Sequence, residues 1–325
     1  FPGYKRRLIS LNSQTPSYNS RLIYVLMFLV AFFWGLAWPV GRMLATDLLE
    51  YPYSVMFFRY LFAIPVLFGW LWFKEGNVVP LKRDYNYLLL LAFTSVFLYQ
   101  FGYMFGMQKT AASDASLIIG FNPVSVSILS VLILSHDLTR NGIIGIFLSF
   151  TGVVLIFVAS PNVDIDFSDR LVGNAYIMFG AFAYAIYVVA MRRYVLLVKD
   201  NPLSSLATIS WVSLFGCFMF VPFVITEAPW DRLWSNDEWF LIAYLGVLST
   251  ALCYVFFAMG VETIGANKAA SFINVVPIFG ILSSWFWIDE ELGYVQVFSF
   301  ILIYFGVRLV NQQPTEGINT KARNR

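Results

Sequence analysis

The sequence predicts an all-α integral membrane protein in which ten transmembrane helices form two inverted five-helix repeats. Of its 325 residues, 59% are hydrophobic and only 12% are charged, whereas soluble globular proteins carry roughly 25% charged residues. Ten apolar runs are long enough to cross a bilayer, and a segment that begins at Gly106 returns in similar form from Gly260. A soluble globular domain is therefore excluded.

The ten predicted spans are separated by short polar segments. A helix needs about 20 mostly apolar residues to cross the hydrocarbon core, and loops exposed to lipid at that depth are strongly unfavourable. Turn and charge signals such as KEGNVVPLKRD and SPNVDIDFSDR mark the breaks between helices. The predicted spans are residues 22–44, 53–73, 86–107, 112–134, 141–159, 171–191, 204–226, 238–260, 266–288 and 293–311.

The internal repeat predicts how the two halves are related. An ungapped alignment of residues 106–157 on residues 260–311 matches small residues and prolines, among them the pairs Gly106/Gly260, Pro123/Pro277 and Gly152/Gly306. Each repeat covers five spans, and an odd number of crossings makes the second repeat enter the membrane from the opposite side. Inverted repeats are typical of secondary carriers, because two equivalent halves can open a central site alternately to each side. A duplication retained only for packing is the alternative.

Domain boundaries and orientation follow from the same pattern. The expected organisation is an N-terminal tail at 1–21, a first repeat at 22–159, a linker at 160–170, a second repeat at 171–311 and a C-terminal tail at 312–325. Residues 1–21 lack the apolar stretch of a signal peptide. Lys and Arg concentrate in the segments on the side of the N-terminus, and the positive-inside rule then predicts that both termini are cytoplasmic.

Two polar side chains within the spans are candidates for binding a substrate. Arg59 lies six residues after the expected start of the second span, roughly 9 Å deep at 1.5 Å per residue. It either holds a substrate carboxylate or a gating carbonyl, or it snorkels and ties a neighbouring helix end. Gln100 lies at mid-depth of the third span between Tyr99 and Tyr103. Its amide can bind a zwitterion or hydrogen-bond to another helix.

Two prolines predict broken helices in the middle of the fourth and ninth spans. Pro123 and Pro277 each remove a backbone donor and free a carbonyl of the preceding turn. Asn122 and Asn274 flank these positions, so each break can offer polar groups to a ligand. A simple kink satisfied by serine side chains is the other interpretation.

Aromatic side chains within the spans complete the candidate site. Those of the first, sixth and eighth spans can form a stacking pocket for an apolar side chain or a cation, or they are ordinary packing. The expected substrate-binding residues are Trp34, Trp38, Arg59, Tyr99, Gln100, Tyr103, Asn122, Tyr184, Tyr187, Tyr254 and Asn274.

Several absences narrow the function. No Asp or Glu lies near the centre of a predicted span, which disfavours a proton-coupled exporter of organic cations. Cys217 and Cys253 lie in apolar runs and provide no CxxC zinc spacing. Because no Walker, HExxH, GxSxG or Rossmann fingerprint occurs, we expect no enzyme activity, no cofactor, no catalytic residue and no metal site.

Four motifs make the chain similar to a known family. FFWGLAWPVGR (Phe32–Arg42) and FFRYLFA (Phe57–Ala63) resemble helix signatures of the drug/metabolite transporter superfamily, and within it of the EamA-type exporters, which include amino-acid exporters. ASDASLIIGFNPVSVSIL and ANKAASFINVVPIFGIL resemble its proline-containing fourth and ninth helices. The acidic turn that usually follows the fourth helix is SHDLT here, with Asp137, whereas the second copy keeps it in DEELG around Glu291.

The resemblance implies a basket of ten helices in which the first, third, fourth, sixth, eighth and ninth line a central cavity. It implies export of amino acids, related metabolites or amphipathic drugs, and a plasma (inner) membrane location. We expect a small-molecule substrate and the lipid bilayer as partners, no nucleic acid, and a monomer. The alternatives are a nucleotide-sugar or phosphate-ester antiporter of the same superfamily and, outside carriers, a membrane scaffold or scramblase.

Overall fold

Helices account for the regular structure of the chain. The computed structural model describes residues 20–134, 139–161, 164–198 and 202–311, and within these ranges it contains no strand. Ten helical segments of the described residues are long and apolar enough to cross a bilayer, which confirms the predicted fold class. Six of them are single helices: α1 (Ser20–Asp47), α2 (Pro52–Glu75), α7 (Arg140–Ala159), α8 (Phe167–Leu197), α9 (Ser205–Glu227) and α14 (Tyr294–Asn311).

The other four spans are interrupted, at equivalent places in the two repeats. The third and eighth each contain a π-helical segment, and the fourth and ninth each consist of two α-helices. The third span is α3 (Tyr85–Ala92), η1 (Phe93–Leu98) and α4 (Tyr99–Met107), and the fourth is α5 (Ala112–Ile119) and α6 (Asn122–Leu134). The eighth is α10 (Asn236–Ala243), η3 (Tyr244–Leu252) and α11 (Cys253–Ile264), and the ninth is α12 (Ala266–Ile273) and α13 (Val276–Ile288). A 3₁₀ turn, η2 (Pro229–Asp231), precedes α10.

The two prolines lie just after these interruptions. Pro123 and Pro277 are in the first turns of α6 and α13, where a missing N–H leaves no intrahelical hydrogen bond unmade. The chain therefore breaks at residues 120–121 and 274–275, within the turn before each proline, where the ring would clash with a carbonyl group if the helix were continuous.

The sixth and eighth spans are longer than their apolar runs. The sixth span was expected at 171–191 and the eighth at 238–260, but α8 covers 31 residues and the eighth span covers Asn236–Ile264. Hydropathy detects only the part of a helix that lies in hydrocarbon, whereas backbone hydrogen bonding continues into the polar region. The expected tails at 1–21 and 312–325 lie almost wholly outside the described residues.

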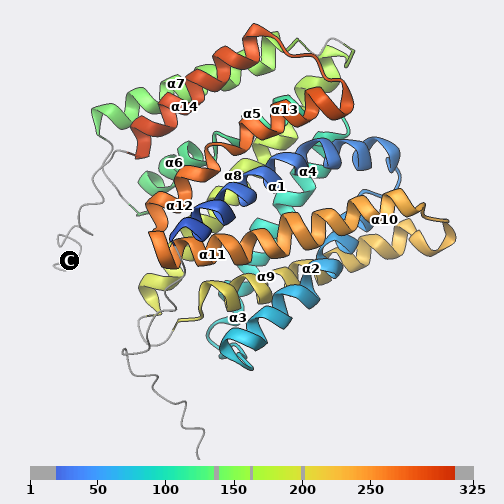
Figure 1. Ribbon diagram of the computed structural model, residues 1–325, viewed down its shortest axis with the longest axis vertical. Coiled ribbons are helices and arrows are strands. Elements are labelled where there is room, and N and C mark those ends of the chain that lie inside the picture. Colours follow the sequence, from blue (N-terminus) through green and yellow to red (C-terminus); the bar gives the residue numbers. More distant parts are fainter. Residues whose placement is uncertain (1–19, 135–138, 162–163, 199–201, 312–325) are drawn as a thin grey trace, which may run out of the picture.

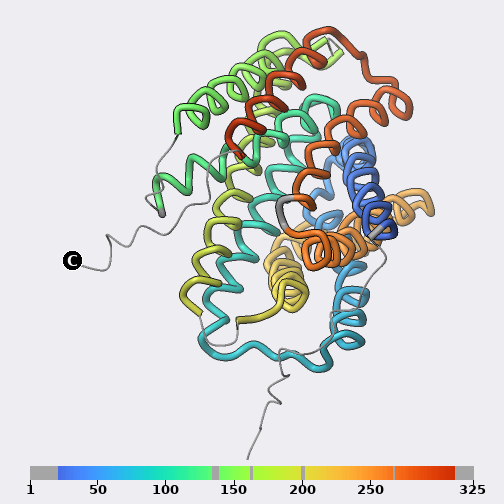
Figure 2. Tube along the Cα trace, turned by 60° about the vertical axis from the view of Figure 1, so that its left-hand side comes forward, coloured from blue at the N-terminus to red at the C-terminus, as the bar shows by residue number. Residues whose placement is uncertain are grey.

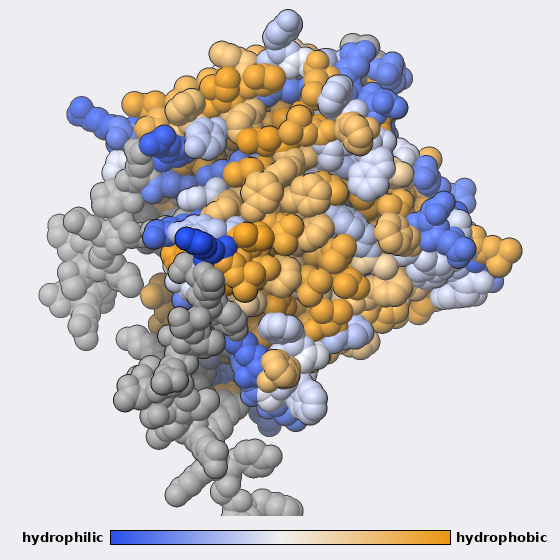
Figure 3. All heavy atoms as spheres, viewed as in Figure 1, coloured by the Kyte–Doolittle hydropathy of each residue, from blue (hydrophilic) through white to orange (hydrophobic). Residues whose placement is uncertain are grey.

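The surface of the bundle is suited to lipid. Figure 3 shows an apolar band across the middle of the molecule, with hydrophilic residues gathered at its two ends. Large apolar side chains such as Trp72, Phe147 and Phe286 are mostly exposed. We call the end at which α1 begins and α14 ends the terminal face, and the other end, where α1 leads into α2, the opposite face (Figure 1).

Helix packing reflects the inverted repeat. The second span packs along its counterpart, the seventh (α2 with α9), and the fifth along the tenth (α7 with α14). The first span packs on parts of the eighth and ninth (α11 and α13), just as the sixth packs on parts of the third and fourth (α4 and α6). Figure 2 shows α7 and α14 together, away from α2 and α9. The interrupted spans and their partners therefore occupy the middle of the bundle.

Glycines allow the closest of these contacts. A Cβ atom on Gly145 of α7 would lie 2.5 Å from the backbone oxygen of Gly306 on α14, and one on Gly102 of α4 would lie 2.8 Å from the backbone nitrogen of Gly180 on α8. Small residues that let helix backbones approach are a common basis of helix association in membranes.

Candidate functional site

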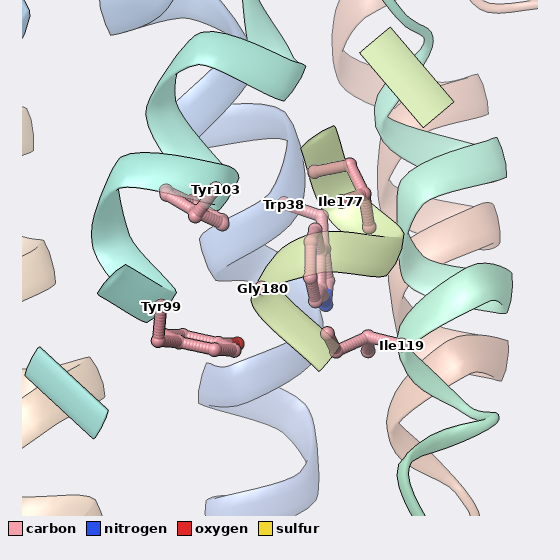
Figure 4. A pocket seen from close by; sticks show the side chains of 6 residues that line it. All are labelled: Trp38, Tyr99, Tyr103, Ile119, Ile177 and Gly180. Atoms are coloured by element: carbon pink, nitrogen blue, oxygen red, sulfur yellow. The ribbon is translucent and has the colours of Figure 1, made fainter. Parts of the chain in front are cut away.

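A small pocket lies among the interrupted spans. In this conformation it is a narrow gap that cannot hold a water molecule, and it is lined by Trp38 of α1, Tyr99 and Tyr103 of α4, Ile119 of α5, and Ile177 and Gly180 of α8. In Figure 4 the Tyr99 hydroxyl points toward the side of the pocket where Trp38 and Ile119 lie. The pocket ends at Ile119, the last residue of α5 before the break in the fourth span. Both repeats contribute to its wall.

Tyrosines extend this wall across the interior. Tyr99 packs on Tyr184 with ring centroids 5.6 Å apart, and Tyr184 packs on Tyr187 at 5.3 Å. Tyr254 of the eighth span lies near all three of these side chains. Each of the four keeps part of its surface accessible although other tyrosines surround it, so the group borders internal space.

Arg59 lies at the edge of this group within a network of neutral polar side chains. Its Nε donates to Thr250 Oγ1 at 3.0 Å and its Nη1 to Gln100 Oε1 at 3.4 Å. Gln100 in turn donates through Nε2 to Tyr60 OH at 3.0 Å. The guanidinium carbon lies 5.7 Å from the ring centroid of Tyr103, which also lines the pocket. The Arg59 network and the pocket therefore share a wall.

The π-helical segments place two members of this network. Thr250 lies within η3 and bonds its own helix through Oγ1 to Leu245 O at 2.8 Å, a five-residue step that belongs to the π-helix. Gln100 is the second residue after η1. π-Helical turns are rare and occur frequently at functional sites, and here the pair flanks the one arginine that enters the interior from α2.

The first span is tied to both sides of the site. Trp34 Nε1 donates to Ser249 O of η3 at 2.8 Å, and Tyr103 OH donates to Ala37 O at 2.5 Å. The Trp34 ring lies 5.8 Å from that of Tyr254, and the Trp38 ring lies 5.4 Å from that of Tyr103. Trp34 thus contacts the second repeat, and Trp38 contacts Tyr103 of the first repeat and Gly280 of the second.

Asn122 and Asn274 lie at the two helix breaks, apart from the Arg59 network. Asn122 begins α6 and Asn274 follows α12, and both are half-buried. Among the described residues, neither side chain hydrogen-bonds to Arg59, Gln100 or Thr250. The Asn122 Oδ1 atom is buried and accepts no hydrogen bond from a described residue, so it is a free acceptor at the break.

The sequence did not single out Tyr60, Thr250 or Ser249. Tyr60 follows Arg59 directly, on a helix in which aromatic residues are common. A serine or threonine within a membrane helix can hydrogen-bond to its own backbone, as Thr250 does. The residue type alone therefore does not predict a role in the site. Only the position of Thr250 opposite Arg59 reveals its role.

Two carboxylates join distant segments at the opposite face. Glu290 accepts from the N–H groups of Ala112 and Ser113 at 2.6 and 2.8 Å and from Ser113 Oγ at 2.6 Å. Glu227, at the end of α9, accepts from the N–H groups of Tyr53 and Ser54 at 2.8 and 2.6 Å and from Ser54 Oγ at 2.5 Å. Each carboxylate caps the positive N-terminal end of a helix far away in the sequence. We call these contacts the Glu290 clamp and the Glu227 clamp.

The Glu227 clamp has a weaker counterpart at the terminal face. Helix α9 is the equivalent of α2 in the second repeat. Glu75 is the last residue of α2, and Glu227 is the last residue of α9. Among the described residues, Glu75 accepts one hydrogen bond, at 2.8 Å from Ser204 Oγ of the residue before α9, whereas Glu227 accepts three. Equivalent carboxylates therefore engage their helix ends unequally at the two faces.

Ten spans in two inverted repeats around an internal pocket define a polytopic membrane transport protein. The chain belongs to the EamA-like transporter family, whose family model matches residues 21–158 and 171–312. It is therefore an integral membrane transporter and not an enzyme, as the sequence predicted.

Relatives and one solved structure agree with this assignment. A Bacillus subtilis (strain 168) protein named Uncharacterized transporter YyaM is 28% identical over 261 residues, which cover 79% of this chain and 83% of the relative. An Archaeoglobus fulgidus protein, also named an uncharacterized transporter, is 25% identical over 260 residues, covering 79% of this chain and 87% of the relative. A crystal structure matches with a TM-score of 0.59 at 15% identity, covering 87% of this chain and 95% of the other, and this likeness shows the fold alone.

Proposed function

We propose that the chain is a secondary transporter that exports small amphipathic metabolites, such as amino acids, related compounds or drugs, by alternating access. The observation that carries the proposal is the position of the pocket and the Arg59 network, at the interruptions of spans from both repeats. Substrate sites of carriers built from inverted repeats lie near mid-membrane at the repeat interface, commonly at broken helices. The pocket combines apolar walls with a few polar groups, as small-molecule sites do.

The unequal carboxylate contacts support alternating access. At the opposite face, Glu227 engages its helix end with three hydrogen bonds. At the terminal face, Glu75 makes one with a described residue, Ser204. A carrier closed at the opposite face has this asymmetry, and exchange of the two repeat conformations would reverse it.

Transport by the purified protein tests the proposal. Alanine at Gln100 and at Asn122 is expected to lower the rate of saturable amino-acid counterflow in proteoliposomes at least tenfold, because each removes a polar group at the pocket or at the helix break. Asn141→Ala, at an exposed position of α7, is the matched control and keeps the wild-type rate. If Gln100→Ala and Asn122→Ala both transport as fast as wild type, the assignment of the site is wrong. If wild type shows no saturable flux of any solute, a scaffold or scramblase is favoured.

We further propose that the terminal face is cytoplasmic, in the plasma membrane, and that a monomer suffices. Glu50 and Lys82 are exposed at the opposite and terminal faces, and Cys217 and Cys253 are buried. In intact cells, a membrane-impermeant thiol reagent is expected to label Glu50→Cys but to label Lys82→Cys only after permeabilisation. The reverse pattern would contradict the orientation.

A further inference from the structure

We propose that Arg59 is an anion-binding residue of the transport pathway and that the solute binds to it through a single carboxylate group. This inference rests on the proposed function, because it assigns the charge class of the solute that the same pocket accepts. It is carried by the surroundings of the guanidinium group.

No acidic side chain among the described residues pairs with the charge of Arg59. Arg59 lies seven residues after Pro52, the first residue of α2, about 10 Å along the helix, and is half-buried. The ion pairs of the described residues do not include it. An arginine stays protonated in proteins, and charged groups at membrane depth are normally paired. The described residues therefore leave the positive charge of Arg59 unbalanced.

The contacts of Arg59 are neutral and leave binding capacity. Thr250 and Gln100 take hydrogen bonds from Nε and Nη1, the second of which is long at 3.4 Å and weak for that reason. The Tyr103 hydroxyl is a further hydrogen-bonding neighbour, and the phenols of Tyr60, Tyr99 and Tyr244 and the Cys253 thiol lie nearby. A guanidinium has five N–H donors in a planar fork that matches a carboxylate. Thr250 and Gln100 thus orient the fork without neutralising it.

The position of Tyr103 connects this charge to the apolar pocket. Tyr103 lies against the Arg59 guanidinium and also lines the pocket beside Trp38. In a conformation that opens this gap, a solute with its carboxylate at Arg59 can therefore place an aromatic or aliphatic body against the tyrosines and Trp38. An organic cation would find no carboxylate there among the described residues. A phosphate ester carries about −1.5 to −2 charge at neutral pH, more than one guanidinium balances.

The test is equilibrium binding of four matched probes to the purified full chain. The probes are 3-phenylpropionate, L-phenylalanine, 2-phenylethylamine and phenyl phosphate, which share a ring and differ in charged groups. The two carboxylates are expected to bind saturably and the amine not to bind at the same concentrations. The relative affinities of the two carboxylates identify the preferred source of the carboxylate. Tighter binding of 3-phenylpropionate indicates a plain acid, and tighter binding of L-phenylalanine indicates a zwitterion.

Variants connect the binding to Arg59. Arg59→Gln is expected to weaken carboxylate binding roughly tenfold to a hundredfold, and Arg59→Lys less, because it keeps the charge but loses the fork. Gln100→Glu places a carboxylate beside Nη1, so it is expected to abolish carboxylate binding while Arg59 is still present. This variant covers the case in which Arg59→Gln does not fold. Arg193→Gln, at an exposed cation of α8, is the matched control and binds like wild type.

Three results would overturn the inference. The first is equal carboxylate affinity of wild type, Arg59→Gln and Gln100→Glu. The second is an amine that binds as well as the carboxylates, or no binding of either carboxylate up to its solubility limit. The third is Arg59-dependent binding of phenyl phosphate that is tighter than that of 3-phenylpropionate. If the carboxylates bind through Arg59 but no counterflow occurs, the proposed function fails alone; if counterflow occurs without dependence on Arg59, this inference fails alone.

Discussion

Replacing Glu290 with alanine is expected to lower the free energy of unfolding by about 3 kcal/mol, because it removes the carboxylate acceptor of two buried N–H groups. Ala112 and Ser113 begin α5 and are fully buried. The first N–H groups of a helix have no intrahelical acceptor, so the Glu290 clamp supplies theirs. Unfolding of the purified protein in detergent measures the loss. Glu290→Gln keeps one acceptor oxygen and is expected to lose about half as much.

The matched control for the Glu290 clamp is a glutamate with an exposed partner. Glu262 bonds Lys74 at 2.8 and 3.1 Å, but its side chain is 52% exposed, and exposed ion pairs contribute about 0–1 kcal/mol. Glu262→Ala is therefore expected to change little. Glu227→Ala is expected to fall between the two, because Ser54 is fully buried but Tyr53 is only half-buried. Equal losses for Glu290→Ala and Glu262→Ala would show that the clamp contributes nothing beyond a surface contact.

Gly102→Ala is expected to lower stability by about 1–3 kcal/mol and to reduce solute binding with it. The new Cβ would lie 2.5 Å from the backbone oxygen of Tyr176 and 2.8 Å from the backbone nitrogen of Gly180, so α4 and α8 must move apart. These helices carry Tyr99 and Tyr184, which pack on each other beside the pocket. Unfolding in detergent and probe binding measure the two effects.

Gly180→Ala is the control for this contact. It places a methyl group on the other side of the same helix pair, but the nearest atom, Tyr99 O, is 3.2 Å away, which a small shift accommodates. Gly180→Ala is therefore expected to unfold close to wild type. If Gly180→Ala lowers stability as much as Gly102→Ala does, the loss is caused by the added methyl group and not by the collision of Cβ with the backbone.

Local composition predicted the spans and their symmetry. Crossing a bilayer requires about 20 apolar residues and forbids open loops at that depth, so a single sequence shows where helices begin and end in hydrocarbon. The pairs Pro123/Pro277 and Gly152/Gly306 revealed the repeat, and an odd number of spans required its inversion. The cost of placing polar groups in hydrocarbon also identified Arg59 and Gln100, because a charge or an amide is rare within an apolar span.

Contacts between distant segments could not be read in this way. Thr250 bonds its own backbone as easily as it accepts from Arg59, and Glu290 is one of several acidic residues in a turn. Asn122 and Asn274 were expected in one site with Gln100, yet they lie at the helix breaks without a hydrogen bond to it.

The sequence by itself therefore determined the ten spans, the inverted repeat and the polar residues at membrane depth, since each depends on the transfer of a side chain or backbone group into lipid. The tertiary structure decided which of these groups meet: Arg59 with Thr250 across the repeats, and Glu290 with the start of α5. Such meetings depend on helix rotation, on π-helical turns and on glycine contacts, which are properties of packing between helices and not of any one segment.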